Sequence, residues 1–315
     1  MRRLLIGFWC GFTMLFDIIA QQDPQYSQYM FNHLSVNSGY AGSHEAICLG
    51  AVHRQQWVGI DGAPVTSLFT VNAPFKMFGA SHGIGLSVMS DQLGFDQNVS
   101  IGLDYAYRIS LGQGKLGIGL SGMFLNKALN ATWNIPGGDV INDPAIPGEK
   151  ESIMGFDMGL GVFYRAENVY LGLSSTHLLE PSLKYKEKPE AKYLSKRHYY
   201  ATAGCLFPMK NPAWEMAPSF MANSDGTASQ ITANINMMYN KKVWFGAGYR
   251  LNEAITAMVG FELFNGVQIG YSFDYTYTSI RSYVSAGGSH EVMLSYCFSL
   301  VKEKVVKKYK SVRFL

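Results

Sequence analysis

The chain has 315 residues, of which 48% are hydrophobic, 14% aromatic and only 16% charged, and its formal net charge is +3. That charged fraction is well below the roughly 25% of soluble domains, and the aromatic content excludes a disordered chain, which lacks apolar surface for a core. Beyond residue 20 no stretch approaches the roughly 20 consecutive apolar residues of a spanning helix, so a helical membrane protein is also excluded and a β-rich chain remains.

The chain begins with features of an export signal. Met1-Arg2-Arg3 is followed by an apolar segment from Leu4 to Ile19 and then by Ala20. This order of basic, apolar and small residues is typical of a secretory signal peptide. We therefore predict a signal peptide over residues 1–20 and export of the mature chain.

An N-terminal segment, residues 21–45, precedes the first predicted strand. It carries Tyr26, Tyr29, Phe31 and Tyr40 among Gln and Asn residues. Because it is too aromatic for a solvated leader, we expect it to fold into the interior of the protein or against its periplasmic rim. Two roles stay open for it, as a plug or as a contact for a partner protein.

Strict alternation of apolar and polar residues dominates the rest of the chain. In the predicted strand 97–111 every odd position from Val99 onward is Val, Ile, Leu or Tyr, and the even positions include Asn98, Asp104 and Arg108. Alternation over so many residues indicates a strand, and one longer than the five or six residues usual in globular proteins. The polar face is rich in Gly, Ser and Asn, whereas the outer face of a soluble sandwich usually carries abundant charge. The pattern favours a membrane barrel with an apolar face toward lipid.

The same alternation predicts fourteen strands, an even number as bacterial barrels require. They cover residues 46–55, 65–75, 82–90, 97–111, 114–126, 154–165, 168–176, 197–208, 213–223, 229–240, 242–252, 254–264, 266–276 and 289–301. With both termini in the periplasm, the three longest loops, 127–153, 177–196 and 277–288, fall outside the cell, as expected of such barrels. We therefore predict an all-β fold, a transmembrane antiparallel β-barrel over residues 46–301, followed by a basic periplasmic tail over 302–315.

Several segments resemble those of a known family. They are Gln22-Asp23-Pro24-Gln25-Tyr26-Ser27-Gln28-Tyr29-Met30-Phe31-Asn32, Ser38-Gly39-Tyr40-Ala41-Gly42-Ser43, Arg54-Gln55-Gln56-Trp57-Val58-Gly59-Ile60-Asp61-Gly62-Ala63-Pro64-Val65-Thr66 and Gly288-Ser289-His290-Glu291-Val292. In this order and combination they are specific, and the resemblance extends to about residue 301. The chain is similar to the PorP/SprF family of outer-membrane proteins of the type IX secretion system in Bacteroidetes, which are Gram-negative.

The resemblance implies a non-catalytic outer-membrane component of protein secretion, with gliding or surface-adhesin export in some relatives. Its implied partners are type IX secretion components of the periplasm and outer membrane, a secreted or surface cargo protein, and outer-membrane lipid. It implies no cofactor and no nucleic acid. From the residues themselves, the sequence has no nucleophile elbow, metal-spaced His/Glu set or phosphate loop. A transport barrel, either a porin or a channel for a hydrophobic solute, is the alternative function, and a barrel enzyme is a more distant one.

The alternation also predicts which charged residues point into the barrel. Because a charge in a narrow interior needs a partner, we expect an internal network of salt bridges and hydrogen bonds, and we favour an occluded lumen over a water-filled conduit. The predicted luminal residues are Asp104, Arg108, Asp157, Arg165, Glu215, Arg250, Glu262, Asp274 and Glu291.

Two regions are candidates for partner binding. Trp57 and Asp61 lie in the first predicted external loop, 56–64, although the Gly and Pro content of this loop is also enough to specify a turn. The tail carries a net charge of +5, which suits an acidic partner or anionic lipid head groups as well as a solvated extension. Its basic residues are Lys302, Lys304, Lys307, Lys308, Lys310 and Arg313.

The remaining reactive residue types indicate no catalytic or metal site. Without the predicted signal peptide, which contains Cys10, the chain keeps an odd number of cysteines with no CxxC spacing: Cys48, Cys205 and Cys297. We therefore predict neither a disulfide framework nor a zinc site but small apolar fillers. His290 and Glu291 are neighbours in a predicted strand and therefore point to opposite faces, which argues against an acid–base dyad.

Overall fold

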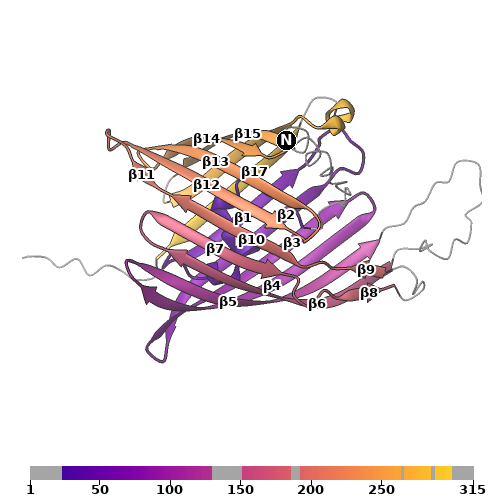
Figure 1. Ribbon diagram of the computed structural model, residues 1–315, viewed down its shortest axis with the longest axis horizontal. Helices are drawn as coiled ribbons and strands as arrows, with labels where there is room; N and C mark the ends of the chain where they lie inside the picture. The colour runs from indigo at the N-terminus through magenta and orange to yellow at the C-terminus, as the bar shows by residue number, and fades with distance from the viewer. Residues whose placement is uncertain (1–22, 130–150, 186–191, 264–265, 285–287, 300–315) are drawn as a thin grey trace, which may run out of the picture.

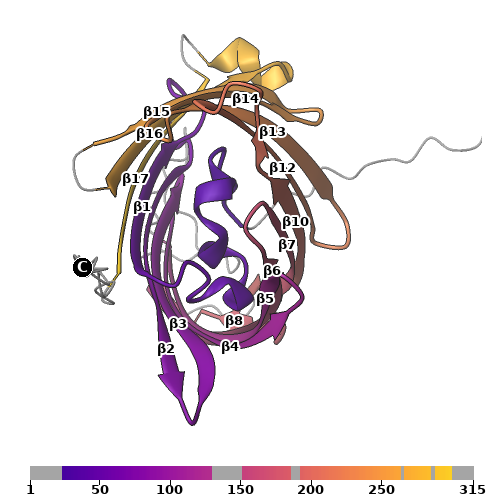
Figure 2. The ribbon, with the colours of Figure 1, turned by 90° about the vertical axis from the view of Figure 1, so that its left-hand side faces the viewer.

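In the computed structural model, the described residues are 23–129, 151–185, 192–263, 266–284 and 288–299. They form a β-barrel whose strands run side by side (Figure 1) and surround a central space (Figure 2). None of the helices in these residues has the length and apolar character needed to cross a membrane. The signal peptide predicted over residues 1–20 lies outside the described residues, as does the basic tail.

All fourteen predicted strands are present, with ends within three residues of the predicted ones. The barrel strands are β1 (Ile47–Gln55), β2 (Val65–Met77), β3 (Ala80–Leu93), β4 (Asp96–Leu111), β5 (Gly114–Leu129), β6 (Glu151–Arg165), β7 (Val169–Thr176), β10 (His198–Cys205) with its short continuation β11 (Phe207–Pro208), β12 (Trp214–Ser224), β13 (Ser229–Tyr239), β14 (Val243–Arg250), β15 (Ala254–Glu262), β16 (Val267–Thr276) and β17 (Ser289–Phe298). The long loop predicted over 177–196 contains a small extra hairpin, β8 (Ser182–Lys184) with β9 (Lys192–Leu194).

Each barrel strand pairs antiparallel with its neighbours in the sequence, and β1 pairs with β17, so the sheet closes on itself. Short connections such as Gly112-Gln113 lie at one end of the barrel, which we call the turn end. Longer connections such as residues 56–64 lie at the other, the loop end. The first strand, β1, begins at the turn end, and the last strand, β17, ends there.

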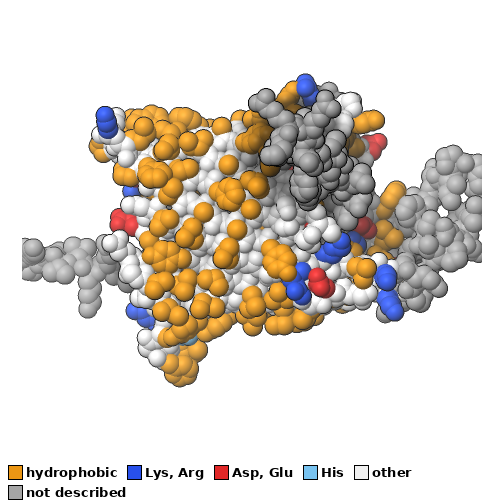
Figure 3. Space-filling model, in the orientation of Figure 1, with side chains coloured by type: hydrophobic (Ala, Val, Ile, Leu, Met, Phe, Trp, Pro, Cys, Tyr) orange, Lys and Arg blue, Asp and Glu red, His pale blue; other side chains and the backbone are white. Residues whose placement is uncertain are grey.

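The two faces of the sheet differ as the alternation predicts. Along β4, Val99, Ile101 and Leu103 are exposed on the outside, while Asp104 and Arg108 are buried on the inside. Apolar side chains spread over the outer surface, and charged ones lie toward its two ends (Figure 3). This arrangement is the one that a lipid-facing barrel surface requires.

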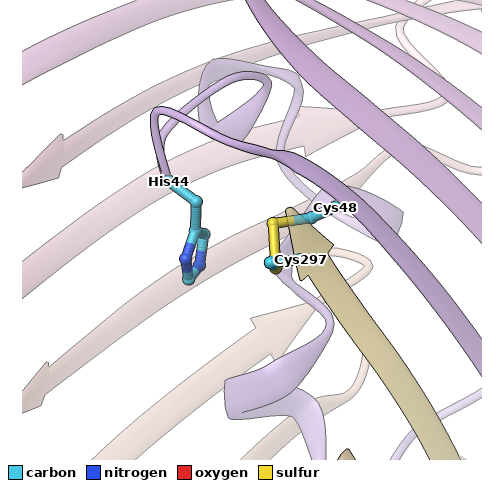
Figure 4. Close-up of side chains that lie close together, drawn as sticks. All are labelled: His44, Cys48 and Cys297. Carbon is cyan, nitrogen blue, oxygen red and sulfur yellow. A yellow bond between two sulfur atoms is a disulfide. The ribbon is translucent and has the colours of Figure 1, made fainter. Parts of the chain in front are cut away.

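The prediction that the cysteines are unpaired fillers is wrong for two of them. Cys48 in β1 and Cys297 in β17 are register partners and form a disulfide (Figure 4). The bond therefore joins the first and last strands of the barrel at the turn end. Cys205 is free. A disulfide suits an exported protein, because such bonds persist in oxidising compartments.

Candidate functional site

The N-terminal segment, here residues 23–46, passes through the interior of the barrel (Figure 2). It includes three short 3-10 helices, η1 (Tyr29–Phe31), η2 (His33–Ser35) and η3 (Ser38–Tyr40). Asp23 contacts residues at the loop end, beside β7 and β10, and His44 contacts Arg165 at the turn end. The segment therefore spans most of the length of the interior before it enters β1.

Four buried charged side chains hold the segment near its start. Arg54, Arg250, Asp274 and Glu291 surround Ser27, and we call this cluster the central anchor. Arg54 Nη2 lies 2.7 Å from Asp274 Oδ2, and Arg54 Nη1 lies 3.1 Å from Glu291 Oε2. Arg250 Nη1 lies 3.6 Å from Asp274 Oδ2. All four side chains are at most 1% exposed, so the opposite charges balance each other away from water.

The central anchor binds the segment through Ser27 and Gln28. The backbone N–H groups of both residues donate to the Glu291 carboxylate, each at 2.8 Å. The Ser27 hydroxyl accepts from Arg54 at 2.8 Å and from Arg250 at 3.1 Å, and it donates to Asp274. A serine hydroxyl can accept two hydrogen bonds and donate one, so the hydrogen-bonding capacity of the Ser27 hydroxyl is fully satisfied. The cluster fixes these two residues of the segment against β1, β14, β16 and β17.

A second cluster holds Asp23 at the loop end, and we call it the Asp23 cluster. The Asp23 carboxylate lies 3.0 Å from His177 Nε2 and 3.8 Å from His198 Nδ1, and Tyr200 donates to it at 2.8 Å. His177 Nδ1 faces Asp157 at 2.8 Å. Burial disfavours the imidazolium, but the two carboxylates outweigh burial and raise the pKa of His177 to about 10. The protonated His177 in turn holds the pKa of Asp23 below its usual range, against the opposing effect of burial.

Glycines on the inner face of β3, β5 and β6 form a bed for the middle of the segment. A Cβ atom at Gly83, Gly117 or Gly119 would collide with backbone atoms of residues 38–42. At Gly161 it would collide with the Asn37 amide. The N-terminal segment thus packs against the inner face that the sequence shows to be rich in small residues, because only glycine lets two backbones approach this closely.

We expect Gly119→Ala to destabilise the docked segment by about 1–3 kcal/mol, because overpacking a close contact forces the backbones apart. The measurement is protease cleavage within residues 23–46 of the purified barrel. Gly122→Ala on the same strand is the matched control, since its Cβ would meet Phe156 at an ordinary 3.4 Å. Equal cleavage of the two variants would contradict the close approach at Gly119.

Aromatic side chains of the segment pack into two apolar clusters, and cavities lie beside the segment. Tyr26 packs with Trp244 and Met293, and Tyr40 packs with Phe163. A cavity of about 360 Å³ opens between the segment and the wall toward the turn end, next to the disulfide. A smaller cavity of about 100 Å³ lies toward the loop end. Residues of the segment line both cavities, so it lies between them.

The structure places the nine predicted luminal residues in different roles. Arg250, Asp274 and Glu291 meet in the central anchor, and Asp157 belongs to the Asp23 cluster. Arg108 donates to the Ala41 carbonyl at 3.2 Å, so it too holds the segment. The other four do not join the two clusters: Asp104 is buried, Arg165 contacts His44, Glu215 lies 3.6 Å from Lys241 Nζ, and Glu262 is half-buried.

The predicted partner-binding residues lie at the surface or outside the described residues. Asp61 is exposed, and Trp57 is half-buried, with its backbone N–H donating to Ser289 Oγ at 3.2 Å. Five further residues of the two clusters were not predicted as site residues: Asp23, Arg54, His177, His198 and Tyr200. The tail residues lie beyond the described part: Lys302, Lys304, Lys307, Lys308, Lys310 and Arg313.

A family model described as "Type IX secretion system membrane protein PorP/SprF" matches residues 18–296 of the chain. Among curated proteins, none matches. Three solved structures that resemble the barrel are outer membrane protein Omp33 of Acinetobacter baumannii (9% identity, 81% of this chain and 99% of that one, TM-score 0.46), the CymD monoaromatic hydrocarbon channel (10% identity, 89% and 95%, TM-score 0.47) and the translocator domain of the autotransporter NalP from Neisseria meningitidis (12% identity, 80% and 87%, TM-score 0.42).

Proposed function

Because this chain belongs to the PorP/SprF family of type IX secretion system membrane proteins and is an outer-membrane β-barrel, we propose that it serves protein secretion as a non-catalytic docking element. Its partner is either the periplasmic machinery or a particular secreted or surface protein. In this role the barrel anchors a partner at the membrane rather than conducting solute through its interior.

The N-terminal segment in the barrel interior is the observation that carries this proposal. A conduit needs an interior lined by water, whereas here the segment is buried from Tyr26 to Gln28 and again at Gly39 to Ala41. The central anchor and the Asp23 cluster hold it at separate points, so its removal exposes several buried charges at once. A segment fixed in this way favours a closed scaffold over a transport barrel.

The first loop supports the docking role, because it is held as a defined surface. The N–H of Val58 donates to the Gly288 carbonyl at 3.0 Å, and the N–H of Gly94 donates to the Gly62 carbonyl at 2.8 Å. These bonds fasten the loop to the residue that precedes β17 and to the β3–β4 turn, while Val58 and Asp61 remain exposed. A preorganised loop loses less conformational entropy when it binds a partner.

Co-purification tests the docking proposal. We expect extraction in a mild detergent to recover the barrel together with a secreted protein or periplasmic ring components. Asp61→Ala, with Asp225→Ala in another exposed loop as the matched control, tests whether the first loop contributes. Repeated recovery of the barrel alone from cells that are actively secreting would overturn the proposal.

Planar-bilayer conductance separates docking from solute transport. We expect the purified wild-type protein to show no stable open channel, because the N-terminal segment occupies the interior. A large, long-lived conductance in the wild type would favour the transport barrel instead.

A further inference from the structure

Three polar side chains in the Asp23 cluster come from separate parts of the chain. Asp23 lies in the N-terminal segment, His177 directly follows β7, and His198 begins β10. One ring nitrogen of each histidine and one oxygen of Asp23 lie within 4.8 Å of one another. His198 is 1% and His177 6% exposed. Two buried imidazoles and a carboxylate are a common set of ligands for a transition metal.

Both imidazoles are oriented by groups behind them. His177 Nδ1 lies 2.8 Å from Asp157 Oδ2, and Asp157 itself accepts from the backbone N–H groups of Met158 and Leu179. His198 Nδ1 lies 2.9 Å from the Lys196 carbonyl, which can only accept, so this nitrogen carries the proton. Metal-binding histidines nearly always donate their second N–H to a carboxylate or carbonyl in this way.

The second ring nitrogen of His198, Nε2, is the atom available to a ligand. With the proton on Nδ1, which is also the His198 nitrogen that lies 3.8 Å from Asp23, the lone pair of a neutral His198 is on Nε2. Nε2 is buried and has no hydrogen-bond partner among the described residues. Leaving a buried polar atom unpaired is costly. The protonated His177 offsets only one of the two negative charges of Asp23 and Asp157, whereas a divalent cation that took the place of its proton would offset both with neutral imidazoles.

We propose that Asp23, His177 and His198 bind a divalent transition-metal cation of the zinc class, which fastens the N-terminal segment to the barrel wall at the loop end. Nitrogen ligands favour such a cation over Mg²⁺ or Ca²⁺, which prefer oxygen. Three protein ligands leave a fourth position for water. The site does not depend on the docking function, because it concerns only how the segment is held.

Another group of potential ligands offers a comparison within the same chain. His44 lies near Cys48 and Cys297 at the turn end (Figure 4). There the two sulfur atoms are bonded to each other, so they are not available as thiolate ligands, which are the form that binds metal. His44 therefore serves as a control for nonspecific binding by a histidine of the same segment.

Titration with zinc chloride tests the site. The full mature protein in detergent is stripped with EDTA, exchanged into chelator-free buffer and titrated by calorimetry. We expect one tight Zn²⁺ per chain, and with Co²⁺ a visible absorption band typical of four-coordinate nitrogen and oxygen ligands. Loss of an outer-shell partner costs about 10–100-fold in metal affinity, so removal of a ligand by His198→Ala should cost at least about 100-fold.

Two further variants test whether Zn²⁺ binds specifically at the Asp23 cluster. His44→Ala should bind Zn²⁺ like the wild type, and Asp157→Asn, which retains all three ligands, should bind about 10–100-fold more weakly. If His198→Ala fails to fold, judged by heat-modifiable migration on gels, Asp157→Asn carries the test. Absence of stoichiometric binding in the wild type, equal affinity of the wild type and the Asp157→Asn variant, or loss of binding only in His44→Ala would overturn the proposal.

Discussion

Replacing Arg54 by alanine is expected to release the N-terminal segment from the barrel interior and to destabilise the folded protein by about 3–5 kcal/mol, the usual cost of removing one partner of a buried ion pair. Arg54 contacts both Asp274 and Glu291 and donates to Ser27. Without Arg54 the central anchor has two carboxylates and only one guanidinium. The excess negative charge stays buried against the segment.

Two measurements follow this change. Urea titration of heat-modifiable migration reports global stability, and limited proteolysis reports exposure of residues 23–46. We expect faster cleavage of the segment in Arg54→Ala and an ion conductance that the wild type lacks. Arg54→Lys should fall between the two proteins, because a lysine keeps the charge but cannot bridge both carboxylates with a planar fork of donors.

Arg281→Ala provides the matched control for loss of a guanidinium. Arg281 is exposed and lies 4.7 Å from the centroid of the Tyr275 ring, a contact worth about 0.5–1 kcal/mol at an exposed site. Its removal should leave proteolysis and conductance unchanged. Equal effects at Arg54 and Arg281 would mean that the central anchor does not hold the segment.

The strands could be predicted from the sequence because lipid and lumen impose a period of two on every one of them. Parity also places individual side chains: Asp274 and Glu291 were predicted to point into the barrel, and both are buried inside it. Parity cannot supply the partner, however. Asp274 and Glu291 lie more than 200 positions from Arg54 in the sequence, and they meet Arg54 only because the barrel closes β1 onto β17.

The path of the N-terminal segment could not be predicted from the sequence for a related reason. Its aromatic content indicated a buried segment, but the choice between plug and partner contact depends on the shape of the inner wall. That shape is set by glycines such as Gly117 and Gly119. The strand pattern alone does not distinguish a glycine that contacts another backbone from a glycine that lines a water-filled interior. Likewise His177 lies in a predicted loop, and nothing in its local sequence indicates Asp23.

The disulfide illustrates how closure changes the interpretation of a sequence. Cys48 and Cys297 were judged by number and spacing, which are useful for small disulfide-rich proteins. In a closed antiparallel barrel with an even number of strands, the start of the first strand and the end of the last lie side by side at the same end. A cysteine near each of these termini is therefore a candidate pair, whatever the separation along the chain.

Replacing both bonded cysteines by serine is expected to destabilise the barrel by about 2–5 kcal/mol, because the bond closes a loop with a sequence separation of 249. The loss should appear at the seam between β1 and β17, whose nine register pairs are the only direct pairing between the start and the end of the described barrel. Hydrogen exchange of the β1 and β17 amides should therefore rise more than that of β4 and β5.

Cys205→Ser separates the effect of the bond from that of the substitution. Cys205 is free and only half-buried in the wall, so its replacement should leave the urea midpoint and the exchange rates unchanged. Reduction of the wild type should reproduce the double variant, and reduction of the double variant should do nothing further. If the reduced wild type keeps its full stability, the pairing of β1 with β17 closes the barrel without the bond, and the disulfide protects the seam only against slow opening.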